Sequence, residues 1–199
     1  TVLVAATLIG ELGSARQKEA LLPAIAAGQK LVSLALQEGP HHAPQQSALS
    51  AAVNEGDYIL NGTKVMVLDA VSAHTFIVIA RTSGASGEEQ GLSAFLVDAD
   101  TAGLTVERRS LVDSRSAGAL VCDNVRIPAA NLLGDLGGAW VGLIRSLDIA
   151  NIGLASELLG VSTEVFERTI VYLQERKQFG RMIGSFQGLQ HRAAELYAE

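Results

Sequence analysis

The chain has 199 residues, of which 48% are hydrophobic and 18% charged, a balance that excludes intrinsic disorder and allows a buried core. Its net charge of −6 without a local basic cluster argues against a nucleic-acid or anionic-membrane surface. One cysteine excludes an internal disulfide and a multi-cysteine metal site. No apolar run of about 18 residues is free of a charge or a glycine, so we expect no membrane span.

The first segment, residues 1–28, is predicted to be helical. Ser14 can cap a helix whose apolar positions share one face, and Gly28 is a plausible stop. Residues 1–9 are apolar and resemble the interior of a helix rather than its start. Residues 193–199 are predicted to be helical, and they contain no Gly, Asn or Pro that would end the helix. We therefore expect a piece of a longer protein. No basic start of a signal peptide is visible, so we expect a cytoplasmic location.

Short strands are predicted from residue 31 onward. They cover residues 31–36, 57–68, 74–81, 92–98, 104–109 and 119–128. Asn61-Gly62, the strongest short turn signal, is predicted to interrupt the second of them. Repeated short strands with turns between them indicate an antiparallel sandwich or barrel.

From Leu132 onward the apolar period changes to that of a helix. One long helix, or two with a kink, is predicted to reach about Gln178, and Ser185 is predicted to cap another helix. Such length is typical of a helical bundle. The order of helix, β-block and long helices predicts an α+β fold.

The densest signal for chemistry is the run ERKQFGRMIGSFQGLQH, residues 175–191. Arg176 offers a planar fork of donors suited to a phosphate or pyrophosphate, the start of the next helix offers free N–H groups, and Gln187 adds an amide. The alternative is an ordinary corner between two helices. In that case Phe179 and Phe186 are core residues and Arg176 pairs with a surface carboxylate.

This run resembles the signature of the acyl-CoA dehydrogenase family of flavoproteins. Three further motifs stand in the family's order, namely NGTK at 61–64, GLSAFLV at 91–97 and VRIPAANLLG at 125–134. The resemblance implies three domains. They are the end of an N-terminal helical domain (1–30), an antiparallel β-sandwich or barrel middle domain (31–131) and the start of a C-terminal four-helix bundle (132–199).

The resemblance implies an activity, a cofactor and partners. Family members use FAD to oxidise acyl-CoA thioesters to trans-2-enoyl-CoA, and an electron-transfer flavoprotein takes the electrons. They are usually dimers of dimers, so a homo- or hetero-oligomer is expected. On the family pattern Arg176 pairs with the FAD pyrophosphate of the neighbouring subunit, while Phe179 and Gln187 line its adenosine part.

The loop that would meet the flavin and the thioester departs from the family pattern L-T-E-P-x-A-G-S-D, because residues 36–44 read LQEGPHHAP. Leu36 and Gln37 stand at cofactor-binding positions, with Gln37 in place of a flavin-bonding threonine. His42 and Ala43 replace a Gly-Ser pair expected at the substrate. The loop is then a reshaped or lost flavin site, or a solvated loop with no role. No metal site is expected, since the adjacent histidines lack a third ligand at suitable spacing.

Three more positions depart from the family pattern. Met66 and Leu68 stand where an aromatic residue and a Thr or Ser would contact the flavin ring, and both could equally be core side chains. Asn151 stands where an arginine would help to hold the CoA or acyl region. The catalytic base is expected beyond Glu199, so no catalytic residue is assigned.

Two main hypotheses remain. The chain is part of a catalytic acyl-CoA dehydrogenase subunit with an atypical flavin pocket, or part of a non-catalytic partner subunit that lends FAD contacts to a neighbour. The changes fall on residues that face the chain's own flavin, whereas the residues offered to a neighbour remain. A structural domain without a flavin role is a third possibility.

Overall fold

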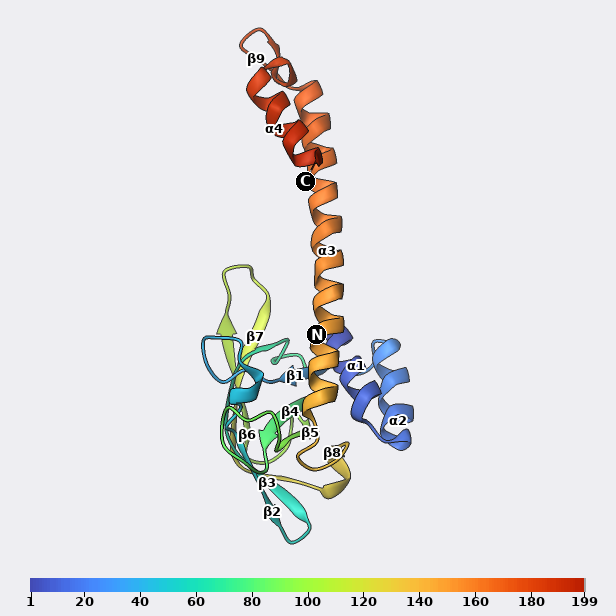
Figure 1. Ribbon diagram of the computed structural model, residues 1–199, viewed down its shortest axis with the longest axis vertical. Helices are drawn as coiled ribbons and strands as arrows, with labels where there is room; N and C mark the ends of the chain where they lie inside the picture. Colours follow the sequence, from blue (N-terminus) through green and yellow to red (C-terminus); the bar gives the residue numbers. More distant parts are fainter. Residues whose placement is uncertain (199) are drawn as a thin grey trace. The chain divides into compact units, whose positions relative to one another are not determined.

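A computed structural model describes residues 1–198 of the chain (Figure 1). The chain forms two compact units, unit 1 with residues 1–150 and unit 2 with residues 151–199. The last residue of the helix expected at the C-terminus, Glu199, lies outside the described residues.

Unit 1 opens with two helices, α1 (Val2–Leu12) and α2 (Ala15–Ala26). The predicted cap is confirmed, because the Ser14 hydroxyl accepts a hydrogen bond from the Gln17 N–H and the Gln17 side chain accepts one from the Ser14 N–H. This reciprocal pair satisfies two N–H groups at the start of α2. Gly28, just past the helix, has a φ of +69°, a conformation that favours glycine.

The middle of unit 1 is one eight-stranded sheet in the order β6-β7-β3-β2-β4-β5-β8, with β1 parallel to β4. Its strands are β1 (Val32–Ala35), β2 (Ser50–Asn54), β3 (Asp57–Leu68), β4 (Thr75–Arg81), β5 (Leu92–Asp98), β6 (Leu104–Ser110), β7 (Ser116–Ile127) and β8 (Leu132–Leu133). Short 3₁₀ turns lie at Pro44–Gln46 and Ala129–Asn131. Apart from β1–β4 and one β2–β4 contact the pairs are antiparallel, which confirms the expected mixture of helices and an antiparallel-rich sheet.

The turn predicted at Asn61-Gly62 is wrong. Strand β3 runs through it with only a shift of register between Leu60 and Gly62, and the real turn lies at Glu55–Gly56, where both residues have positive φ. Gly62 is required because an added Cβ would lie 3.0 Å from the Leu49 Cα. The Asn-Gly pair is therefore a bulge inside a strand, and β2, which the sequence did not predict, supplies the missing arm of the hairpin.

Two apolar clusters cover the two faces of the sheet. One joins side chains of β3 and β7 to side chains of β4 and β5, so the sheet curves around it. The other packs α1, α2 and the start of α3 (Trp140–Glu175) on the opposite face, where Figure 1 shows α1 and α2 side by side. Strand β4 is buried on both faces, because Phe76 and Val78 enter the first cluster and Ile77 and Ile79 the second.

Unit 2 contains residues 151–175 of α3, a two-stranded hairpin and a second helix. The hairpin pairs β9 (Lys177–Gln178) with β10 (Arg181–Met182), and a 3₁₀ turn (Ile183–Ser185) leads to α4 (Gln187–Ala198). Ser185 does not cap α4 as predicted, since its hydroxyl donates to the Met182 carbonyl at 2.7 Å. Helix α4 returns beside α3, with the rings of Phe166 and Tyr197 6.2 Å apart.

Helix α3 is long and apolar enough to cross a membrane by length and composition. This differs from the expectation that no segment would qualify, because a span can tolerate an occasional charge or glycine. The core helix of a soluble protein passes the same test, so this single helix is weak evidence for a span.

Candidate functional site

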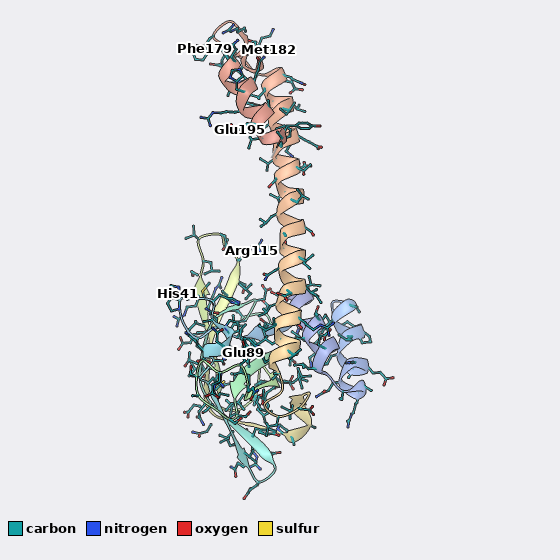
Figure 2. The ribbon with its side chains drawn as sticks, in the orientation of Figure 1. His41, Glu89, Arg115, Phe179, Met182 and Glu195 are labelled. Carbon is teal, nitrogen blue, oxygen red and sulfur yellow. The ribbon has the colours of Figure 1, made fainter. Side chains whose placement is uncertain are left out.

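In unit 1 the loop between β1 and β2 surrounds a cavity of about 250 Å³. The cavity is lined by Leu36, Gln37, Glu38, Gly39, Pro40, His41, Ala43, Gln46 and Ser47. Three of the residues singled out in the sequence therefore share one pocket, whereas His42 is exposed and is not part of its lining. His41 lies at the surface of the unit (Figure 2).

The Gln37 side chain is turned into its own loop. Its amide nitrogen donates to the Gly39 carbonyl at 3.1 Å and also to the His41 carbonyl. Both amide hydrogens are thus used within the loop. The Gln37 carbonyl accepts from the Val65 N–H at 2.6 Å, which ties the loop to strand β3.

Met66 and Leu68 lie on the exposed face of β3, with 51% and 44% of their surface accessible. Val67 between them is buried, so the alternative that Met66 and Leu68 are core side chains is wrong. Met66 has a φ of +51°, and the register with β7 shifts between Lys64 and Val67, which marks a bulge. Leu68 also lines a hollow of about 550 Å³ together with residues 1–3.

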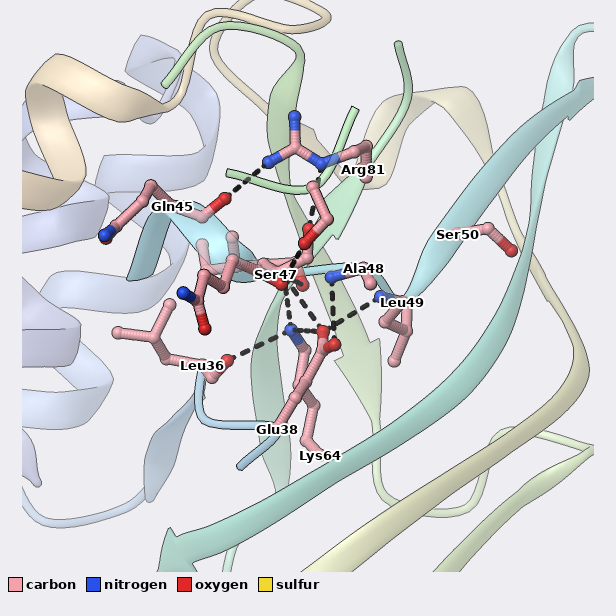
Figure 3. Close-up of polar contacts among 12 residues, drawn as sticks. Leu36, Glu38, Gln45, Ser47, Ala48, Leu49, Ser50, Lys64 and Arg81 are labelled. Carbon is pink, nitrogen blue, oxygen red and sulfur yellow. Dashed lines mark hydrogen bonds and ion pairs between the residues drawn. The ribbon is translucent and has the colours of Figure 1, made fainter. Parts of the chain in front are cut away.

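Sequence reasoning missed the most unusual group of the unit, the fully buried Lys64 (Figure 3). Its ammonium nitrogen lies 2.6 Å from Glu38 Oε1, 2.7 Å from Ser47 Oγ and 3.1 Å from the Leu36 carbonyl oxygen. All three ammonium hydrogens therefore have acceptors. Side chains of a strand alternate between its two faces, and Lys64 falls on the alternate positions that also hold the buried Tyr58 and Leu60. A lysine at such a position could have indicated a buried charge.

Glu38 connects Lys64 to the far end of the loop. Its carboxylate accepts from the backbone N–H groups of Ala48 and Leu49, each at 2.9 Å. Burial alone raises the pKa of the Glu38 carboxyl, but the charge and hydrogen bond of Lys64 and the two N–H groups bring it below its usual value. The carboxylate is therefore ionised at neutral pH.

Burial lowers the pKa of Lys64 from 10.5 to about 8, against the attraction of Glu38. Burial also raises the pKa of the Cys122 thiol to about 11, with nearby Lys64 acting in the opposite direction. Cys122 is a free, buried cysteine in strand β7.

Arg81, at the end of β4, holds the same loop from the other side and was also missed in the sequence. It is 8% exposed and donates five hydrogen bonds, all to backbone carbonyls. Its acceptors are the carbonyl oxygens of Gln45, Ser47, Ser83, Glu88 and Gln90. The stem of the loop is thus fixed by two buried cations.

In unit 2 the hairpin presents its functional candidates to solvent. Phe179 is 89% exposed and has a φ of +54°, and Gly180 follows with +76° (Figure 2). An aromatic residue in the left-handed region costs about 1–2 kcal/mol. Arg181 stacks on the Phe186 ring at 4.0 Å, and the Phe186 and Phe179 rings meet edge to face at 6.2 Å.

Two contacts expected of an ordinary helix corner are not seen among the described residues. Phe179 is not in a core, and among the described residues no carboxylate pairs with the exposed Arg176 guanidinium. Gln187 is exposed at the first position of α4. The three residues expected to contact the cofactor here, Arg176, Phe179 and Gln187, are therefore all exposed on unit 2.

The remaining candidates lie on α3. Asn151 is exposed, and so are three glutamates of the same helix. These glutamates are Glu157, Glu164 and Glu167. Glu164 forms an ion pair with Arg168 at 2.6 Å, one turn along the helix.

The residues of the two units fit FAD to different degrees. On unit 2, the exposed Arg176 guanidinium and the exposed Phe179 ring are groups that suit an anionic dinucleotide with an aromatic base. On unit 1, Met66 and Leu68 offer apolar surface to a flavin ring, but the Gln37 amide has no free hydrogen to donate. Unit 2 thus offers a cation for the pyrophosphate, whereas unit 1 offers the flavin ring apolar surface without a Gln37 donor.

Comparison with known families identifies both parts of the chain. The family model of the acyl-CoA dehydrogenase middle domain matches residues 36–125, and that of the acyl-CoA dehydrogenase C-terminal domain matches residues 140–199. The predicted family is thereby confirmed. The predicted domain boundaries at residues 30 and 131 remain predictions.

Individual proteins that are similar to this chain are also acyl-CoA dehydrogenases. The chain is 37% identical over 193 residues to a short/branched chain specific acyl-CoA dehydrogenase of Bos taurus, covering 95% of this chain and 44% of that protein. Butyryl-CoA dehydrogenase of Megasphaera elsdenii has a similar structure, with a TM-score of 0.91 and 28% identity over 100% of this chain and 53% of that one. A glutaryl-CoA dehydrogenase of Mycobacterium smegmatis, solved with FADH2, has a TM-score of 0.86 and 31% identity over 96% of this chain and 49% of that one.

The chain thus spans about half the length of these relatives. The two matched domains, the shared fold and the ERKQFGR run at the hairpin lead to one conclusion: this chain belongs to the acyl-CoA dehydrogenase family.

Proposed function

We propose that this chain is the middle and early C-terminal part of an acyl-CoA dehydrogenase that introduces a trans-2 double bond into an acyl-CoA thioester with FAD. The observation that carries the proposal is the hairpin of unit 2. Arg176 has no carboxylate partner among the described residues, and Phe179 is held exposed in a strained conformation. Strain of this kind persists where a ligand uses it.

Each residue has a stated part in the proposal. Arg176 binds the FAD pyrophosphate of a neighbouring subunit, and Phe179 and Gln187 contact its adenosine part. Met66 and Leu68 exclude water from one side of the flavin ring of this chain's own cofactor. When bound, FAD supplies the hydride acceptor. The carboxylate that removes the α-proton lies beyond residue 199 in this proposal.

The proposal is tested by the FAD affinity of the intact protein after Arg176→Ala. Loss of one charge-assisted pair weakens binding by about 1.5–3 kcal/mol, or roughly 10- to 150-fold in Kd. Arg168→Ala is the matched control, because Arg168 is exposed on the same unit but already paired with Glu164. Equal FAD affinity of the Arg176→Ala variant and the wild type would contradict the proposal.

A second candidate function follows from unit 1. The Gln37 amide is satisfied by its own loop and Leu68 has no donor, so this chain offers the flavin ring no side-chain hydrogen bond from these two positions. This observation favours a non-catalytic partner subunit of a heteromeric dehydrogenase, which lends Arg176, Phe179 and Gln187 to a catalytic neighbour. Stoichiometric flavin absorbance near ~450 nm in the purified intact protein, without any partner, would contradict this second function.

Partners and location belong to the same proposal. Acyl-CoA is the proposed substrate and an electron-transfer flavoprotein the proposed electron acceptor. The proposed assembly is a dimer of dimers, homomeric for the first function and heteromeric for the second. A cytoplasmic location and the absence of nucleic-acid or membrane partners also stay predictions.

A further inference from the structure

The loop at residues 37–47 of unit 1 is held by its two ends rather than by its middle. Lys64 binds the Leu36 carbonyl just before the loop at 3.1 Å and the Ser47 hydroxyl at its last residue at 2.7 Å (Figure 3). Glu38 binds Lys64 at 2.6 Å and the N–H groups of Ala48 and Leu49. A single buried ammonium thus joins both stems of the loop.

The same lysine lies next to the bulge that exposes Met66 and Leu68. Val65, the residue after Lys64, donates its N–H to the Gln37 carbonyl at 2.6 Å. The loop and the exposed end of β3 are therefore connected twice, once through this backbone bond and once through the Lys64 side chain. Lys64 therefore contacts the segments that form both surfaces.

Stability alone does not explain a charged pair at this place. Taking an ammonium and a carboxylate out of water is costly, and an apolar pair of similar volume is often as stable or more so. What the charged pair adds is geometry, because each ammonium hydrogen has one acceptor at a fixed place. All three residues that supply these acceptors, Leu36, Glu38 and Ser47, line the cavity.

We infer that Lys64, Glu38 and Ser47 are positioning residues, which hold the loop 37–47 at a fixed place relative to Met66 and Leu68 and thereby set the affinity for the flavin. They touch no cofactor in this account and act through the loop. The inference rests on the proposed function, since it takes the surface formed by the loop, Met66 and Leu68 as the seat of the flavin ring.

The test uses the intact protein with Lys64→Met, and Lys30→Met as the matched control. Lys30 makes only a 3.7 Å surface ion pair with Asp98. Two quantities are measured where each variant is fully folded by circular dichroism: the Kd for FAD, and amide hydrogen exchange without cofactor. For Lys64→Met we expect a Kd at least 10-fold higher and at least 10-fold faster exchange at Ala48 and Leu49, with exchange at Ile77 and Ile79 unchanged.

A merely structural role gives a different pattern. It lowers the melting temperature but leaves both the Kd of the folded protein and the exchange at Ala48 and Leu49 as in the wild type, and that result would overturn the inference. If Lys64→Met does not fold, Ser47→Ala decides, because it keeps both charges and removes one ammonium acceptor. We then expect roughly threefold or greater changes in both quantities, and no change in either would overturn the inference.

The experiment gives a separate result if the proposed function, rather than the inference, is wrong. A wild-type protein that binds no FAD contradicts the proposed function, and the exchange measurement still decides whether Lys64 holds the loop. Faster exchange at Ala48 and Leu49 with an unchanged FAD Kd would show that the loop is clamped but does not seat the flavin, which overturns the positioning role.

Discussion

The loop 37–47 and the hairpin 177–182 differ in whether their polar side chains are bonded within the chain or exposed to solvent. In the loop, the Gln37 amide, Glu38 and the buried cations Lys64 and Arg81 are all bonded to the chain itself. In the hairpin, the neighbouring Arg176 guanidinium has no carboxylate partner among the residues described, and Phe179 is exposed in a left-handed conformation. The polar groups of the loop are thus satisfied within unit 1, whereas the side chains at the hairpin are exposed to solvent.

This difference explains how a family site can change on one side only. A loop whose donors are satisfied internally can lose side-chain contacts to a ligand and still keep its shape, because buried backbone groups remain paired. Arg176, just before the hairpin, forms no ion pair with a carboxylate among the described residues, so such a pair adds nothing to the stability of unit 2. Retention of Arg176 and Phe179 therefore argues for a ligand.

The largest expected effect tests whether the internal bonds of the loop matter to the fold. Arg81→Leu leaves five buried or partly buried carbonyls without their donor, so we expect the free energy of unfolding to fall by about 3–5 kcal/mol. Urea denaturation measures it. Arg108→Leu, on the exposed edge strand β6, is the control and should change it by less than about 0.5 kcal/mol. A loss below about 1 kcal/mol for Arg81→Leu would show that the loop does not depend on these bonds.

The pH dependence of stability sharpens the comparison, because Lys64, which holds the loop, is fully buried and ionisable. The pKa of Lys64 is lowered from 10.5 to about 8, so above pH 8 the unfolded chain binds more protons and stability rises with pH, by at most about 1.4 kcal/mol per unit. The pKa of Cys122 is raised from 9.0 to about 11, so above pH 9 its contribution falls.

We therefore expect stability to rise from pH 8 to 9 and to level off above 9, as measured by urea denaturation across this range. The rise should disappear in Lys64→Met, and in Cys122→Ala it should continue past pH 9. A flat profile in the wild type would mean that the Lys64 pKa is not lowered.

A smaller effect is expected when hydrogen-bond donors for the flavin are introduced into the loop region, which reduces the contrast between the two regions. Gln37→Thr with Leu68→Thr restores the residue types expected from the family pattern, and each hydroxyl can add a hydrogen bond of about 0.5–1.5 kcal/mol to flavin binding. The matched control is Gln37→Val with Leu68→Val, which has the same shape without hydroxyls. Fluorescence titration with FAD should show tighter binding for the threonine pair alone. Equal Kd values for the two pairs would place the flavin ring elsewhere.

The smallest effect concerns the strained turn of the hairpin. Asn-Gly is the preferred pair where two successive residues have positive φ, so Phe179→Asn should stabilise the hairpin by about 0.5–1 kcal/mol. The same change removes the exposed ring and should weaken FAD binding. Thermal unfolding and FAD titration of one protein sample measure both. Lower stability together with unchanged binding would make Phe179 a structural residue.

The sequence predicted strands best where side chains are buried on both faces. Strand β4 reads as a dense apolar run because Phe76 and Ile77 enter different clusters, and β5 pairs with it along its whole length. Strand β2 was missed because Ser50–Asn54 contains two alanines, which have low β-propensity, and its arm of the hairpin depends on β3.

Some residues of the candidate site could be predicted from the sequence and others could not. The positions of Gln37, Met66 and Arg176 follow from motif spacing, so a resemblance finds them. The burial of Lys64 and Arg81 does not follow from it, because their acceptors come from distant segments such as Leu36 and Gln90. Only the folded chain brings those carbonyls together.

The most direct test of the central claim is an experimental structure of the intact protein with FAD bound. We expect the Arg176 guanidinium of one subunit within about 3 Å of the pyrophosphate of a cofactor that is held mainly by the neighbouring subunit. A bound cofactor whose pyrophosphate is contacted only by residues of a single subunit, with Arg176 remote from it, would contradict the account.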